Sequence, residues 1–133
     1  PDQSCCQTPS VAHEYCYRHQ CYETTRLVAD YLELKPGTFS TSFQSRLAGD
    51  KWLDPYTDKT IKNFAKTGTK YMAVVTPAFV SDCLETLEEI GIEAVEDFED
   101  NGGENLHVVP CINDREGWIK VLSRWIDEWA VAS

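Results

Sequence analysis

Apolar residues alternate along the chain between helical and strand-like spacings. The segment 21–34 has the spacing of an amphipathic helix and stops at the Lys-Pro-Gly sequence of 35–37. A β-favouring run at 38–45 predicts a first strand, and the segment 105–113 predicts a third. Between them, the run 70–79 is almost continuously apolar, which is typical of a strand buried on both faces of a parallel sheet.

Three further helices are predicted. Thr57 or Asp58 can cap a helix over 57–68, and Ser81 can cap another that runs to the turn at 100–103. The last helix, 115–130, carries on its apolar side Trp118, Ile119, Leu122, Trp125, Ile126 and Trp129. Strands that alternate with helices of this length predict an α/β fold with a three-layer, mostly parallel sheet flanked by helices.

The size and charge of the chain narrow its possible partners. With 133 residues it is expected to form one ordinary domain. Its formal net charge of -10 argues against nucleic acid, limits membrane association to a peripheral one, and favours a cationic ligand or a metal. No segment resembles a membrane span or an export leader, so we expect a cytoplasmic protein. Because the chain begins at Pro1 and its only methionine is Met72, we expect it to be processed or part of a larger protein.

Five carboxylates share one stripe of the helix predicted from Ser81. At about 100° per residue they span about 80°, and they are Asp82, Glu85, Glu89, Glu93 and Glu96. The arc expected to pack on the sheet holds Leu84, Leu87, Gly91, Ala94, Val95 and Phe98. A solvated face is the simplest interpretation, but like charges spaced i, i+4 repel and the stripe contains no Lys or Arg. A bound cation, or protons shared between neighbouring carboxyl groups, would offset the repulsion.

Three stretches of the sequence resemble a known family. They are FQSRLAGDKWLDPYTD at 43–58, TPAFVSDCLETLEEI at 76–90 and PCIN at 110–113. From about Cys16 to its end, the chain is similar to the C-terminal domain of bacterial ferrochelatase, which inserts ferrous iron into protoporphyrin IX to form haem. The resemblance implies the chelatase fold, in which two similar α/β domains hold the porphyrin in the cleft between them. The partner would then be the N-terminal ferrochelatase domain of the same protein.

The resemblance also implies roles for residues at the carboxyl edge of the predicted sheet, where open α/β folds bind their ligands. Glu85 would face the macrocycle, and Glu89 and Glu93 would continue a line of acids that accepts the pyrrole protons or relays the metal. Where some members have a histidine, this chain has Cys83. The residues expected at the substrate are Arg46, Trp52, Leu53, Phe79 and Asp82. Arg46 would contact a porphyrin propionate, the alternative being a solvated arginine, and core packing is the alternative for the apolar residues.

One feature of the family is absent from this chain. The family's catalytic histidine lies in an S-x-H-G motif, and none of His13, His19 and His107 stands in that context. The motif is expected to precede the chain, so the chain alone is expected to be an inactive half of the enzyme. Two alternatives keep the fold, namely a coproporphyrin chelatase and a cobalt chelatase. A non-catalytic module that binds an iron-sulfur cluster or zinc is the alternative from another class.

Four of the six cysteines gather near the start of the chain, namely Cys5, Cys6, Cys16 and Cys21. Thiolates suit both iron-sulfur clusters and zinc, so their spacing alone does not choose the metal. The segment resembles the cysteine-bearing insertion of bacterial ferrochelatases with a 2Fe-2S cluster, which favours iron-sulfur. Adjacent side chains of an extended chain point in opposite directions, so only one of Cys5 and Cys6 is expected to be a ligand. A further thiolate would then come from upstream, from Cys83 or from Cys111.

The predicted organisation is a cysteine-rich, cluster-binding segment at 1–21 followed by a C-terminal chelatase α/β domain at 22–133. Cys111 follows an apolar strand, and its simplest role is that of a small core residue.

Overall fold

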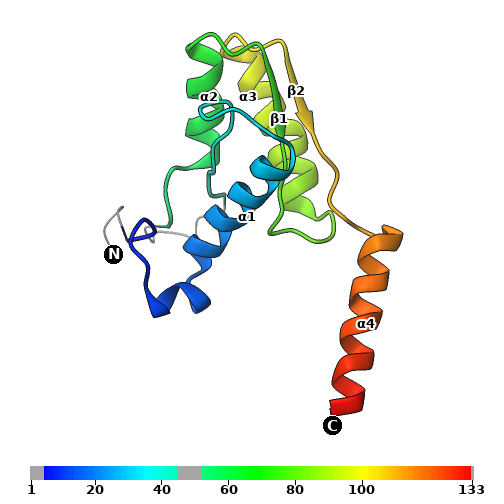
Figure 1. Cartoon of the computed structure of the whole chain (residues 1–133). Coiled ribbons are helices and arrows are strands. Elements are labelled where there is room, and N and C mark those ends of the chain that lie inside the picture. The colour runs from blue at the N-terminus through cyan, green and yellow to red at the C-terminus, as the bar shows by residue number, and fades with distance from the viewer. Residues whose placement is uncertain (1–4, 45–51, 133) are drawn as a thin grey trace. The chain divides into compact units, whose positions relative to one another are not determined.

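A computed structural model describes residues 5–44 and 52–132 (Figure 1). The chain forms two compact units, Pro1–Ile61 and Lys62–Ser133. Its helices and strands, in order, are η1 (Val11–Tyr15), α1 (Tyr17–Tyr31), α2 (Thr57–Lys66), β1 (Tyr71–Val74), η2 (Glu85–Glu93), α3 (Ala94–Asp100), β2 (Asn105–Val108) and α4 (Glu116–Ala132). Helices η1 and α1 belong to the first unit, and all elements from β1 onward belong to the second.

Aromatic contacts around Phe43 organise the first unit. Phe43 is only 4% exposed, and its ring centroid lies 5.9 Å from that of Tyr22 and 6.5 Å from that of Tyr17. Its backbone forms an isolated parallel bridge with Tyr56. Aromatic pairs of this kind contribute about 0.5–1.5 kcal/mol each beyond the area they bury. They therefore fasten the segment around Phe43 to α1.

The strand predicted at 38–45 is wrong for the residues that the structure describes there. The only strand-like pairing among these described residues is the backbone bridge at Phe43. The threonine hydroxyl groups of the segment bond elsewhere. Thr38 Oγ1 donates to a backbone carbonyl three residues earlier at 2.8 Å, and Thr41 Oγ1 donates to Thr25 Oγ1 at 2.8 Å. Threonine and serine side chains that bond in this way compete with a regular strand ladder.

A β-α-β arrangement forms the second unit, with β1 and β2 as parallel neighbours (Figure 1). Tyr71 pairs with Asn105 at one end of the ladder and Val74 with Val108 at the other. Between the strands run η2 and α3, and α3 packs against β2. Ile90, Ala94 and Phe98 of this connection are buried, and so is Leu106 of β2. The parallel sheet flanked by helices that the sequence predicted is thereby confirmed.

Only one face of the two strands is buried, whereas the sequence predicted burial of the first on both faces. In β1, Met72 and Val74 are half-buried but Tyr71 is 72% exposed. In β2, Leu106 is 5% exposed while His107 is exposed. Alternate residues of a strand point to opposite faces, so the packing of α3 against β2 buries one face and leaves the other open.

The acidic helix begins later than predicted, and its first part is a π-helix. Ser81 lies in a bend outside the helix, so its predicted role as N-cap is wrong. Within η2 the backbone bonds span five residues, and the Ala94 N–H accordingly bonds to the carbonyl of Glu89.

This wider winding changes which residues face the core. Thr86 and Ile90 are each 3% exposed, whereas Leu84 and Leu87 are 73% and 60% exposed. The apolar arc predicted from α-helical spacing is therefore wrong for the two leucines. It is confirmed further along for Ala94 and Phe98, which belong to α3 and are 5% and 0% exposed.

The terminal helix α4 forms as predicted, but none of its residues is buried. The Trp118 and Trp125 rings meet edge to face at 5.9 Å, while Ile126 and Trp129 are 63% and 71% exposed. A pair of opposite charges one turn apart, Lys120 and Glu116, supports the helix at 2.7 Å. Among the described residues, none of the helices has both the length and the apolar character needed to cross a membrane.

Candidate active site

The carboxyl ends of β1 and β2 lie at the same edge of the sheet, because the strands are parallel. Open α/β folds bind their ligands at such an edge. Past the ladder, the Val109 N–H donates to the Val74 carbonyl at 2.9 Å, and the Asn113 N–H donates to the Val80 carbonyl at 2.9 Å. The loops that follow the two strands are thus joined to each other through their backbones.

Asp82 and Asn113 join the same two loops through reciprocal hydrogen bonds. The Asp82 N–H donates to Asn113 Oδ1 at 2.9 Å, and Asn113 Nδ2 donates to Asp82 Oδ2 at 2.6 Å. The other carboxylate oxygen, Oδ1, accepts from the Thr86 hydroxyl at 3.2 Å and the Cys111 N–H at 3.4 Å. These donors lower the pKa of Asp82, the Asn113 amide most of all. Both carboxylate oxygens of Asp82 are therefore engaged by donors of the protein itself.

Asn113 is a residue that the sequence analysis missed as part of the site. It ends the PCIN stretch and has a φ of 51°, in the left-handed region that asparagine tolerates better than most residues. Its Nδ2 also lies 3.2 Å from the Cys111 carbonyl oxygen. The available signal was an asparagine just after one strand and an aspartate just after its predicted neighbour. Cys111 itself is 6% exposed, which confirms it as a core residue.

Thr86 closes the first turn of the acidic helix. Its hydroxyl accepts from the Cys83 N–H at 2.9 Å, and the Cys83 carbonyl accepts from the N–H groups of Thr86 at 3.1 Å and Leu87 at 2.9 Å. The first donors of a helix have no partner within the helix, so side chains normally satisfy them. Here the Cys83 carbonyl accepts from two of these N–H groups, and no side chain among the described residues caps the start of η2.

Glu85, at the first position of η2, is half-buried and interacts with Cys83. The hydrogen bond from the Cys83 side chain is the main cause that lowers the pKa of the Glu85 carboxyl group, and its own backbone N–H acts in the same direction. Burial raises this pKa, but the two hydrogen bonds outweigh it. Glu85 is consequently ionised near neutral pH.

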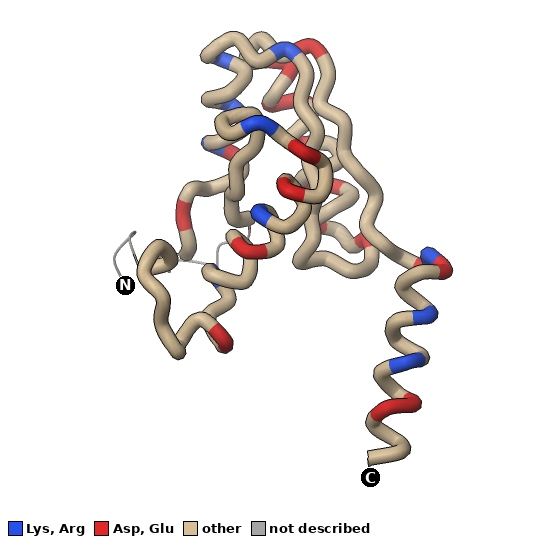
Figure 2. Tube along the Cα trace, viewed as in Figure 1, with Lys and Arg blue, Asp and Glu red and all other residues tan. Residues whose placement is uncertain are grey.

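Acidic residues dominate the connection that leads from this edge back to the start of β2. Ten Asp and Glu residues stand between positions 82 and 104, and no Lys or Arg occurs from position 71 to position 114. Figure 2 shows these acidic positions along η2, α3 and the turn that follows. Glu89 and Glu93 are exposed on η2, whereas Asp97, on α3, pairs with Lys62 at 3.0 Å. A surface of this kind produces a negative potential that concentrates cations.

The other residues predicted at the substrate are distributed over the chain. Phe79 is half-buried in the loop after β1, where its N–H donates to the Thr76 carbonyl at 3.0 Å, so it belongs to the same unit as Asp82. Trp52, 41% exposed, and Leu53, half-buried, belong to the first unit. Arg46 lies outside the described residues.

The N-terminal cysteines lie in the first unit, and all of them are half-buried: Cys5, Cys6, Cys16 and Cys21. Residues 5–7 form a turn, and the side chains of Cys5 and Cys6 hydrogen-bond to each other. The expectation that these two side chains point apart is wrong, because it assumed an extended backbone. Burial is the main cause that raises the pKa of the Cys6 thiol, followed by its contact with Cys5.

Basic and aromatic groups border these thiols. Arg18 Nη1 lies 3.7 Å from Cys5 Sγ, and the rings of His13 and His19 stack with their centroids 3.8 Å apart. Thiolates suit a 2Fe-2S cluster in kind. Within residues 5–44 and 52–132, however, no three His, Cys, Asp or Glu side chains are arranged to hold a metal ion. The donors fit a cluster by their chemistry but do not fit it in this arrangement.

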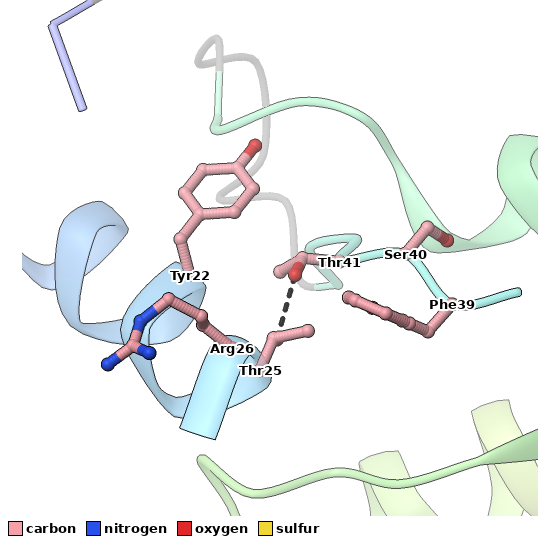
Figure 3. A pocket seen from close by; sticks show the side chains of 6 residues that line it. All are labelled: Tyr22, Thr25, Arg26, Phe39, Ser40 and Thr41. Carbon is pink, nitrogen blue, oxygen red and sulfur yellow. Dashed lines mark hydrogen bonds between the residues drawn. The ribbon is translucent and has the colours of Figure 1, made fainter. Parts of the chain in front are cut away.

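A cavity of about 260 Å³ lies in the first unit, between α1 and the segment that follows it (Figure 3). It is lined by Tyr22, Thr25, Arg26, Phe39, Ser40 and Thr41. The guanidinium of Arg26 is paired with Glu23 at 2.5 Å and Asp30 at 2.6 Å on the helix surface. None of the predicted site residues lines the cavity, so it is not the candidate active site.

Comparison with known proteins identifies the family. The ferrochelatase family matches residues 7–130. The chain belongs to the ferrochelatase family. It is 48% identical over 129 residues to a ferrochelatase of Opitutus terrae, and the aligned range covers 97% of this chain and 37% of that protein. It is 53% identical over 106 residues to a ferrochelatase of Brucella abortus, strain S19, and the aligned range covers 80% of this chain and 30% of that protein.

The chain therefore spans about a third of the length of the ferrochelatases that it matches. The matched range contains both β-strands, the acidic helix and the Asp82–Asn113 pair, but it begins after Cys6. A parallel sheet flanked by helices is consistent with the chelatase-like fold of ferrochelatase.

Proposed function

We propose that the chain is the C-terminal domain of a ferrochelatase, and that the complete enzyme inserts ferrous iron into protoporphyrin IX to form haem. The observation that carries the proposal is the placement of Glu85, half-buried at the carboxyl edge of the sheet and with a pKa that the contact with Cys83 lowers. The names and similarity of the relatives support the same activity.

The chemistry of metal insertion suits a line of ionised carboxylates. A dication must lose its water shell as it enters the macrocycle, and two pyrrole protons must leave. An ionised Glu85 can accept a proton or attract the metal, and Glu89 and Glu93 continue the line along the exposed side of η2. The surrounding negative potential favours the approach of ferrous iron, which is the substrate here.

A second domain supplies the rest of the proposed site. The chain covers about a third of its relatives, and none of its histidines stands in an S-x-H-G sequence. The N-terminal domain would therefore contribute the catalytic histidine and the second wall of the porphyrin cleft. On this side, Phe79, Trp52 and Leu53 would line the cleft, and Arg46 would pair with a propionate.

A separate role is proposed for the cysteine-rich segment. Cys5, Cys6, Cys16 and Cys21 would bind a 2Fe-2S cluster. The contact between the Cys5 and Cys6 side chains supports it, and Cys16 is near enough to contribute to the raised pKa of the Cys6 thiol. Cluster binding requires these thiols to rearrange into a four-ligand set.

Metal insertion by the complete protein tests the main proposal. Protoporphyrin IX and ferrous iron are mixed with the protein without oxygen, and the replacement of the free-base absorption by that of haem is followed. Haem formation above the rate without protein supports the proposal. Parallel reactions with coproporphyrin III, or with cobalt in place of iron, identify the other chelatases of this fold. If the protein inserts metal into none of these rings, the main proposal is overturned.

A further inference from the structure

Asn113, in the loop after β2, makes two reciprocal hydrogen bonds with Asp82, which stands just before the acidic helix. Asn113 accepts from the backbone of Asp82 through Oδ1 and donates to the carboxylate of Asp82 through Nδ2. It therefore fixes both the main chain and the side chain of Asp82. Three residues further on stands Glu85, the first residue of η2.

We propose that Asn113 is a positioning residue for Glu85, acting through Asp82. The inference rests on the proposed function, in which Glu85 acts on the substrate. Asn113 itself need not touch the porphyrin or the metal.

Short contacts transmit the position of Asp82 to Glu85. Thr86 links the Asp82 carboxylate, at 3.2 Å, to the Cys83 N–H, at 2.9 Å. Glu85 directly precedes Thr86 at the first position of η2, so the contacts of Thr86 also fix the backbone that carries the Glu85 side chain. Every residue from Asp82 to Thr86 except Leu84, which is exposed, is half-buried or buried. Displacement of Asp82 would therefore remove one hydrogen bond from the buried Thr86 hydroxyl and one from the Cys111 N–H, and would loosen the first turn of the acidic helix.

The residue type at position 113 follows from the geometry. The amide is both donor and acceptor, and the backbone is left-handed, with φ 51°. Glycine would keep this backbone conformation and lose the side-chain bonds. Aspartate would keep the acceptor but would place a carboxylate against that of Asp82.

An exchange of the two side chains is the decisive variant. In the double variant Asp82→Asn with Asn113→Asp, the new aspartate accepts from the backbone N–H of residue 82, and the new asparagine donates to it. Both hydrogen bonds of the pair are restored with the donor and acceptor side chains reversed. The bond from Asn113 Nδ2 to the Cys111 carbonyl, at 3.2 Å, is lost in this variant and in both single Asn113 variants, so it does not affect the comparison among them. A role of Asp82 on the substrate requires the carboxylate at position 82, and the exchange removes it from there.

The experiment compares these variants in the complete protein. Asn113→Gly and Asn113→Asp are expected to lower kcat by about tenfold to a hundredfold while the KM for porphyrin changes less than about twofold, because a hydrogen bond to a charged group is lost. The exchange variant is expected to recover kcat to within about threefold of the unaltered protein. Asn101→Gly is the matched control, since it also removes an amide donor, to the Asp97 carbonyl at 2.7 Å, but lies at the end of α3. Its kcat is expected to stay unchanged.

Amide hydrogen exchange gives a readout that does not depend on activity. In Asn113→Gly, the N–H groups of Cys83, Thr86 and Leu87 should exchange faster, whereas those of β1 should not. Unchanged exchange at these three amides would overturn the positioning role. The positioning role would also be overturned by a wild-type kcat in both single Asn113 variants, or by a double variant that folds but does not recover kcat. Failure of the unaltered protein to form haem would instead overturn the proposed function. The amide hydrogen-exchange rates would still decide whether Asn113 fixes the start of the acidic helix.

Discussion

The Cys83 side chain bonds to the carboxylate of Glu85 across the start of η2, and it is the main reason for the lowered pKa of that carboxylate. Position 83 is where the resemblance noted in the sequence implies a histidine in some members and this chain has a cysteine. The structure shows that this cysteine contacts the residue proposed to act on the substrate. The contact makes the ionisation of Glu85 depend on residue 83.

Replacement of Cys83 by alanine should shift the pH dependence of the complete enzyme. Loss of the hydrogen bond raises the pKa of Glu85 towards its ordinary value of 4.5, so the carboxylate becomes protonated at a higher pH on acidification. The acid limb of kcat/KM is therefore expected to move to higher pH. Cys83→Ser keeps a donor and should hold the limb near its original position. An acid limb that is the same in all three proteins would contradict this relationship.

Glu85→Gln should remove most of the activity while the protein stays folded. The substitution preserves shape but deletes the charge and the basicity, and general acid–base groups typically contribute about a hundredfold or more to rate. Metalloporphyrin formation and the thermal midpoint are measured for each variant. Glu88→Gln is the control on the same helix, and its activity should stay close to that of the unaltered enzyme. Equal losses in both variants would mean that the carboxylates are a solvated helix face.

Local sequence patterns predicted the elements whose residues contact near neighbours. The parallel strands followed from the apolar runs around Met72 and Leu106, and Phe98 was placed on the buried side of its helix. The π-helical winding of η2 was not predictable from a spacing of 3.6 residues, so Ile90 was missed and Leu87 was assigned to the core. Apolar spacing identifies a helix but does not distinguish two similar windings.

The parts of the site that were missed depend on residues distant in sequence. Asn113 pairs with Asp82 across 31 positions, and nothing in the local pattern of either residue requires the other. The contact of Cys5 with Cys6 was missed for a local reason, because the sequence analysis assumed an extended chain where the structure has a turn. Residues at the edge of a sheet can be predicted as a group from strand order, but their hydrogen-bond partners cannot.

Gly103→Ala should destabilise the second unit. A Cβ atom at this position would lie 2.2 Å from Cδ1 and Cε1 of Phe98, whose side chain is 0% exposed and cannot move aside freely. Overpacking of this kind typically costs about 1–3 kcal/mol. Urea denaturation of the complete protein should show this loss. Gly117→Ala in α4 meets no atom within 4 Å and should be neutral or slightly stabilising. Equal midpoints for the two variants would show that Phe98 is less tightly packed than the structure indicates.

The cysteine-rich segment should bind iron and sulfide when the complete protein is purified without oxygen. Cys16→Ser and Cys21→Ser should each lose the visible absorption and most of the acid-labile sulfide, since a 2Fe-2S cluster is held by four thiolates and serine does not replace them well. Cys5→Ser and Cys6→Ser decide whether both adjacent residues are ligands, as their mutual contact suggests. Cys83→Ser is the control, and it should keep the absorption unless its thiol supplies a ligand in place of one of the adjacent pair. Stoichiometric zinc without sulfide would overturn the cluster, because thiolates bind both metals but only the cluster contains inorganic sulfide.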